Sequence, residues 1–145
     1  MIHFDLIGQL HRTAKANGWA FTAGDTFYQN LDLIQAKLEP SQLVLTAEFN
    51  TMPTIRGGRV QEVRYTGSIL LGRKVDADGT DASLDETYLE KYDARLLELM
   101  QLLVIFIGQF GCDNELDIEG LELPHAINRF DSNIDFVGGN VTFVQ

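Results

Sequence analysis

Two segments with alternating apolar and polar residues, 42–52 and 60–73, constrain the fold of this chain more than any other feature. A period of two is typical of a β-strand that has one face against a core and the other toward solvent. The sequence Arg56-Gly57-Gly58-Arg59 separates the segments and carries the paired glycines that short hairpin turns favour. We therefore predict an antiparallel hairpin of two half-buried strands.

The register of this hairpin requires one extra residue. A two-residue turn at Gly57-Gly58 would place Phe49 opposite Thr66, and the apolar faces of the two strands would then lie on opposite sides. One additional residue in either strand restores the match. Because proline donates no hydrogen bond to a sheet ladder, we predict a bulge or break near Met52-Pro53, with a hairpin arm projecting beyond it.

Helical periodicity marks the N-terminal segment. Residues 2–17 carry apolar residues at four-residue spacing, which predicts an amphipathic helix. Asn17-Gly18 ends this helix, because glycine readily adopts the left-handed conformation of a helix cap. We expect Trp19 and Phe21, which follow, to pack back on the core.

A long helix is predicted over 84–110. Ser83 and Glu86 have the spacing of a capping box, and Gly111 follows the last apolar residue. The half from Leu99 to Phe110 is apolar nearly all round, which indicates that it is covered on several sides. Either the N-terminal helix or another subunit would share that burial.

The other segments complete the expected fold. Residues 24–40 read as irregular with one helical piece at Leu31, Ile34 and Leu38. Residues 115–123 and 125–132 read as strand segments, and 133–145 as a last strand with a bulge or kink at Gly138-Gly139. We predict a single domain over 1–145 of the α+β class. Its mainly antiparallel sheet has a projecting hairpin and is packed by an N-terminal helix and one long central helix.

Charge and hydropathy limit the partners. The formal net charge is −10, from 11 basic and 21 acidic residues, and such a surface repels phosphate and anionic lipid. The longest apolar run, Leu102 to Ile107, is far shorter than a membrane span, and the N-terminus lacks the shape of a signal peptide. We expect an intracellular protein with no membrane partner and no direct sequence-specific nucleic-acid partner.

An acidic loop at 74–83 invites a calcium hypothesis, because alternating oxygen ligands suit a hard cation. Its carboxylates are Asp76, Asp78 and Asp81, with Asp85 beyond them. The EF-hand pattern fails, since Asp81 stands where glycine is required and Thr87 where an acid is required. We interpret the loop as a solvated acidic segment before a helix and expect no metal.

Candidate catalytic residues do not form a motif. His3, His11 and His125 lack metal-ligand spacing, and Cys112 reads as a small buried apolar residue. Four carboxylates alternate with apolar residues, and we interpret them as the solvent-exposed face of a strand: Glu115, Asp117, Glu119 and Glu122. We expect no enzyme and no cofactor.

Arg56 and Arg59 lack the P-loop spacing of a phosphate cradle. They form a basic hairpin tip on an acidic chain, and such a tip can pair with the acidic surface of a second copy or of a partner.

The order of these elements resembles the tail-terminator and related minor tail proteins of long-tailed bacteriophages and prophages. The points of contact are the helix ending in Asn17-Gly18-Trp19, the hairpin over 42–73 with its irregular arm at Pro53–Arg59, the long helix over 84–110, and the closing strand with Val137-Gly138-Gly139-Asn140-Val141-Thr142-Phe143.

The resemblance implies a structural protein that assembles in the bacterial cytoplasm and resides in the virion tail. It implies a ring, usually of six copies, that caps the tail tube and contacts the head connector. The two halves of the subunit interface would be the arm, with Arg56 and Arg59, and the acidic loop, with Asp76, Asp78 and Asp81. The alternative is a small α+β module that binds a ligand or peptide in a pocket lined by Trp19, Phe21 and Phe106.

Overall fold

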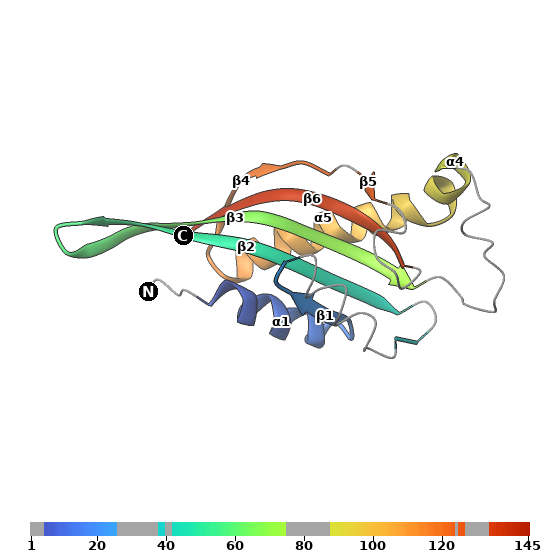
Figure 1. The fold of residues 1–145 in the computed structure, drawn as a ribbon, viewed down its shortest axis with the longest axis horizontal. Coiled ribbons are helices and arrows are strands. Elements are labelled where there is room, and N and C mark those ends of the chain that lie inside the picture. Colours follow the sequence, from blue (N-terminus) through green and yellow to red (C-terminus); the bar gives the residue numbers. More distant parts are fainter. Residues whose placement is uncertain (1–4, 26–37, 40–41, 75–87, 124, 127–133) are drawn as a thin grey trace.

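The computed structural model describes residues 5–25, 38–39, 42–74, 88–123, 125–126 and 134–145 (Figure 1). In chain order the elements are α1 (Leu6–Ala16), β1 (Ala20–Ala23), β2 (Leu43–Arg56), β3 (Arg59–Lys74), α4 (Tyr88–Lys91), the π-helical stretch η1 (Tyr92–Leu96), α5 (Leu97–Asp113), β4 (Asp117–Leu121), β5 (His125–Ala126) and β6 (Ile134–Val144). The predicted α+β class with a mostly antiparallel sheet is confirmed.

The strands form one sheet in the order β1-β2-β3-β6-β4, and β5 also pairs with β6. β1 runs parallel to β2, whereas the other strand pairs are antiparallel. β1 is not predicted from the sequence. Its four residues are too few to show a periodic hydrophobic pattern. The strand forms by pairing Ala20–Ala23 with residues 44–47 of β2.

Gly57 and Gly58 form the turn between β2 and β3, with φ angles of 58° and 73°. Such turns require a positive φ at both central positions, which glycine adopts without strain. The register shifts between the pairs Thr54–Glu62 and Ile55–Val60, so Gln61 of β3 is the extra residue.

The predicted bulge near Met52-Pro53 is therefore confirmed, although the extra residue belongs to β3 rather than to β2. Pro53 pairs with Val63 in an unbroken part of the ladder. β1 reaches only as far as Ala47, so β2 is an edge strand at Pro53, and edge strands tolerate proline where no ladder hydrogen bond is donated.

The main core lies between the sheet and the helices α1 and α5, which cover the same face of it (Figure 1). Leu6, Leu10 and Ala14 give α1 its buried stripe, as their spacing predicts. Phe110 of α5 packs edge-on against Phe143 of β6, with ring centroids 5.6 Å apart.

A second, smaller cluster lies on the opposite face of the sheet. It contains Leu38, Val44, Leu70, Ile134 and Phe136. The prediction that the hairpin strands are half-buried is thus wrong near Val44, which is 1% exposed although it faces away from the helices. An alternating pattern in the sequence shows which residues of a strand face the main core. It does not show whether the other face is covered as well, as it is here by Leu38.

The two helix ends differ from each other. At the end of α1, Gly18 has a φ of 75°, and the N–H groups of Gly18 and Trp19 donate to the carbonyls of Lys15 and Ala14. This is the hydrogen-bond pattern of a glycine-capped helix, as predicted.

The prediction that Gly111 closes the long helix is wrong. α5 continues to Asp113, and Glu115 adopts the left-handed conformation with a φ of 55°. Gly111 is buried inside the helix, where a Cβ would lie 3.1 Å from the carbonyl oxygen of Leu116. Its small size lets the chain entering β4 pack against α5. The predicted start of the helix and the Ser83–Glu86 capping box lie outside the described residues.

The predicted bulge at Gly138-Gly139 does not interrupt the pairing of β6 with β3, which runs without a register shift from Ile134 to Val144. Gly138 has a φ of 147°, and a Cβ there would lie 2.1 Å from the carbonyl oxygen of Ile69. Glycine is needed at this position because two backbones approach closely.

Candidate functional site

The β2–β3 hairpin extends past the rest of the sheet (Figure 1). β6 pairs with β3 from Arg64 to Lys74, and the backbones of Val63 and Gln145 exchange two hydrogen bonds of 2.9 and 3.0 Å. Residues 54–62 lie beyond these contacts and pair across the hairpin with one another. We call residues 54–62 the arm. At the rise of an extended strand, it reaches roughly 13 Å beyond the sheet.

The arm has two chemically different faces. Ile55 pairs with Val60 and shares its face with the helix side of the sheet, whereas Arg56 pairs with Arg59 on the opposite face. The extra residue Gln61 keeps Val60 on the apolar face, because a shift of one residue exchanges the two faces of a strand. Ile55 is 62% exposed.

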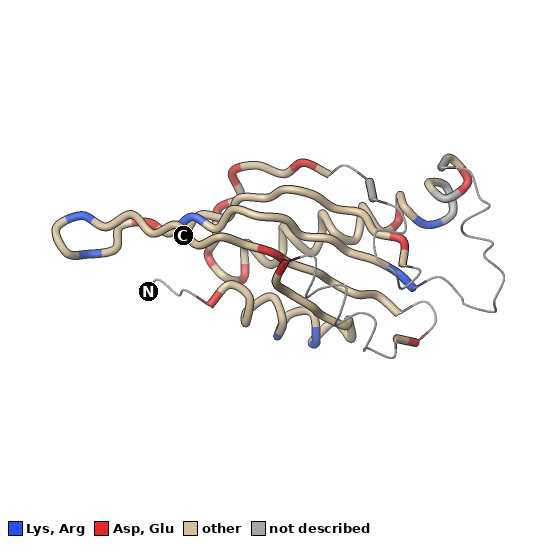
Figure 2. Tube along the Cα trace, viewed as in Figure 1, with Lys and Arg blue, Asp and Glu red and all other residues tan. Residues whose placement is uncertain are grey.

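Arg56 and Arg59 are exposed at the end of the arm, and within the described residues neither forms an ion pair. Figure 2 shows these two basic residues at the tip and acidic residues spread over the body. The structure thus places the basic half of the predicted subunit interface on one protrusion. Asp76, Asp78 and Asp81, the predicted acidic half, lie outside the described residues.

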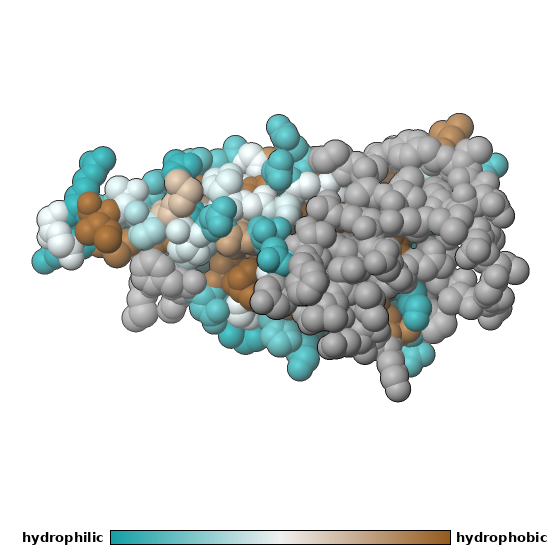
Figure 3. Space-filling model, viewed as in Figure 1, coloured by the Kyte–Doolittle hydropathy of each residue, from teal (hydrophilic) through white to brown (hydrophobic). Residues whose placement is uncertain are grey.

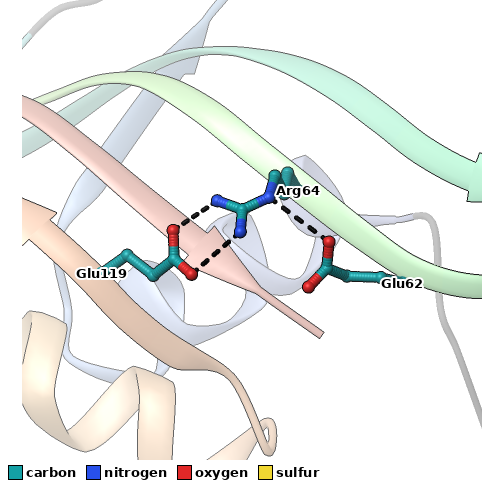
Figure 4. Close-up of polar contacts among 3 residues, drawn as sticks. All are labelled: Glu62, Arg64 and Glu119. Carbon is teal, nitrogen blue, oxygen red and sulfur yellow. Dashed lines mark hydrogen bonds and ion pairs between the residues drawn. The ribbon is translucent and has the colours of Figure 1, made fainter.

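An ion cluster lies at the base of the arm (Figure 4). Arg64 of β3 holds Glu119 of β4 with both terminal guanidinium nitrogens, one of them 3.0 Å from a carboxylate oxygen, and its Nε lies 3.3 Å from Glu62. The hydrogen bond between Arg64 and Glu119 lowers the pKa of the Glu119 carboxyl and raises the pKa of the Arg64 guanidinium. Both groups therefore stay charged at neutral pH. The cluster links β3 to β4 across β6 beside the arm.

Sequence reasoning placed Glu119 among exposed carboxylates and missed this pairing. The partners are 55 residues apart in sequence, and only the strand order brings them together. Glu115, Asp117 and Glu122 are exposed, as predicted. The interpretation that they form one face of a strand is wrong, because Glu115 and Glu122 lie outside β4 and because Ile118 within β4 is also 39% exposed.

The outer face of α5 is apolar and uncovered. Val104 and Ile105 are 46% and 68% exposed, so the N-terminal helix does not cover this face, and cover by another subunit stays a prediction. A groove of ≈ 440 Å³ runs along it, lined by Met100, Gln101, Val104, Ile105 and Leu123.

A second groove, of ≈ 370 Å³, lies between α1 and α5. Trp19 and Phe106 line it, with ring centroids 5.1 Å apart, and Ile105 borders both grooves. Phe21, which the pocket hypothesis places beside them, stacks instead on the ring of His11 at 5.3 Å. We call this second groove the α1–α5 groove.

The candidate catalytic residues do not converge in the part of the chain that the structure describes. Cys112 is exposed on α5, so the prediction that it is buried is wrong. The described residues hold no group of three histidine, cysteine or carboxylate side chains placed to bind a metal ion. His3 and Asp85 lie outside the described residues.

No helix in the described ranges is long and apolar enough to cross a membrane. Comparison with models of protein families finds no match. A search of curated proteins likewise finds no similar sequence.

Proposed function

We propose that this chain is a structural tail protein of a bacteriophage or prophage, and that its copies join in a ring that caps the tail tube and contacts the head connector. The observation that carries the proposal is the arm, which leaves the sheet and ends in two arginines that form no ion pair within the described residues, on a chain of net charge −10. The order of helix, long hairpin, long helix and closing strand supports the tail-terminator resemblance. The chain would act in the virion tail after assembly in the bacterial cytoplasm.

A ring requires an interface in which one patch meets a different patch on the next copy. The arm provides the first patch, because its basic end is attracted to the acidic surface of the next copy. Without the arm, the acidic bodies of two copies would repel each other. The exposed apolar face of α5 provides a surface that a neighbour would cover. A ring of six acidic subunits would also let DNA pass through its centre without adhering, since like charges repel.

Reversing the charge of the arm is expected to abolish self-assembly. The variant Arg56→Glu/Arg59→Glu changes the formal charge from −10 to −14, because each reversal lowers it by two. The arm of this variant repels the acidic body of the next copy. Sedimentation velocity of the full chain over a concentration series should show assemblies for the native chain and only monomer for the variant.

Arg12→Glu/Lys15→Glu is the matched control, because it makes the same charge change at two exposed residues of α1. This control should assemble like the native chain. If the arm variant and the native chain sediment alike at every concentration, the arm has no role in assembly and the proposal fails.

A second candidate function is the binding of a small ligand or a peptide, which the α1–α5 groove favours because two aromatic rings line it. This function predicts a monomer whose groove is filled by another molecule. It also predicts that the arm variant behaves like the native chain.

A further inference from the structure

We propose that the α1–α5 groove is the receptor for the arm, so that the arm of one copy lies in the groove of the next. This inference rests on the proposed function and deepens it, because it names the two surfaces that would join the copies. The acidic loop that sequence analysis offers as the receptor is not needed for it.

The groove is apolar with one charged end. Trp19, Leu102, Ile105 and Phe106 supply much of its lining, and Asp113 is the charged side chain among the described residues that line it. Asp113 belongs to the last turn of α5, where the helix dipole adds further negative potential. Glu115 and Asp117 follow directly and are exposed. A fitting partner therefore has an apolar face and a basic end.

The arm has this combination. Ile55 is exposed on one face, beside Val60, which is half-buried against the chain's own main core. Arg56 and Arg59 occupy the other face next to the turn. In the single chain, Ile55 is 62% exposed and Ile105, which lines the groove, is 68% exposed. Burying each against the other removes both from water. Arg56 and Arg59 then stay solvated on the outer face of the arm, close enough to the acidic end of the groove to be attracted by its negative potential.

The position of the arm makes this contact one between copies. In Figure 1 the arm extends away from the sheet and from the helices that form the groove. Figure 3 shows brown apolar side chains close to the tip of the arm, on the surface of the molecule. Gly108 is exposed on α5 one turn after Ile105, and a Cβ there would meet no atom within 4 Å. No side chain at that position holds an approaching strand away from the helix.

Chemical crosslinking tests the contact with the native cysteine as one probe. Cys112 is the single cysteine of the chain and lies exposed on α5, one turn after Gly108. The second probe is Gln61→Cys on the arm, in a chain that also carries Cys112→Ser. Mixing this variant with the native chain and adding a short bismaleimide should give a covalent heterodimer. Each chain treated by itself should give little product.

The matched control moves the cysteine to the sheet. Thr66→Cys with Cys112→Ser places an exposed thiol on the outer face of β3, away from the arm, and should give no heterodimer. A chain with Cys112 intact that carries Ile105→Asp should yield at least roughly tenfold less heterodimer with the arm probe, because a charged carboxylate replaces the apolar side chain that the arm would bury. Ile105 is exposed in the single chain, so this change leaves the fold intact.

The other outcomes overturn the inference in different ways. Covalent homodimers of the native chain through Cys112 would show that α5 packs on α5. Native assemblies without a Gln61→Cys heterodimer would refute the arm in the groove and leave the ring proposal standing. A native chain that stays monomeric and gives no crosslink would refute both.

Discussion

Replacing Asp135 with alanine is expected to lower the free energy of unfolding by about 3–5 kcal/mol, the cost of breaking a buried ion pair by removing one partner. Asp135 lies on β6 and is fully buried, and the Nε of Arg95 in η1 donates to its carboxylate at 3.1 Å. This pair ties the π-helical stretch to the sheet. Without the carboxylate, the guanidinium group, whose side chain is 20% exposed, loses its counter-charge. Urea denaturation of the full chain measures the change.

The control for Asp135 is Glu98, a carboxylate that also pairs with an arginine. Glu98 lies 3.4 Å from Arg73, but its side chain is 59% exposed. Solvent screens exposed pairs, so Glu98→Ala should change the free energy of unfolding by no more than about 0.5 kcal/mol. Equal effects of the two substitutions would show that the Arg95–Asp135 pair does not hold η1 to the sheet.

Gly138→Ala is expected to destabilise the fold by more than about 3 kcal/mol, because backbone strain and a steric clash act at one position. The new Cβ would lie 2.1 Å from the carbonyl oxygen of Ile69 and 2.8 Å from the Cα of Leu70. Both atoms belong to the backbone of β3, which cannot move without breaking its ladder with β6. The φ of 147° adds strain for any residue with a side chain.

Gly108→Ala is the counterpart of this substitution with the opposite expected sign. Gly108 lies within α5, and a Cβ there meets nothing within 4 Å. Alanine in a helix interior is favoured over glycine by roughly 0.5–1 kcal/mol, so the monomer should become more stable. Thermal unfolding at low concentration compares the two variants. A loss of stability in Gly108→Ala would contradict the open space described at Gly108, and an unchanged stability in Gly138→Ala would contradict the packing described around Gly138.

Local patterns predicted the parts of the fold that depend on local chemistry. The paired glycines gave the turn, and the four-residue spacing of Leu6, Leu10 and Ala14 gave the buried stripe of α1. The strand β1 escaped prediction because its existence depends on a neighbour more than 20 residues later, at Val44–Ala47. Two glycines were interpreted wrongly: Gly111 was predicted to end a helix and Gly138 to mark a bulge, whereas both allow close packing.

The candidate site likewise has features that could be predicted from the sequence and features that could not. Arg56 and Arg59 could be placed at a protruding tip because the turn between them is a local feature. The α1–α5 groove could not be predicted, since it is a gap between two helices whose separation the sheet determines. The exposure of Ile105 and Cys112 likewise follows from which side of α5 the sheet covers.

If copies of this chain join through unlike surfaces into a closed ring, native mass spectrometry of the full chain should detect the ring as its concentration rises. We expect a transition from monomer to one closed assembly with six times the mass of a single chain. Monomer at every concentration, or an assembly that stops at the dimer, would show that no such ring forms.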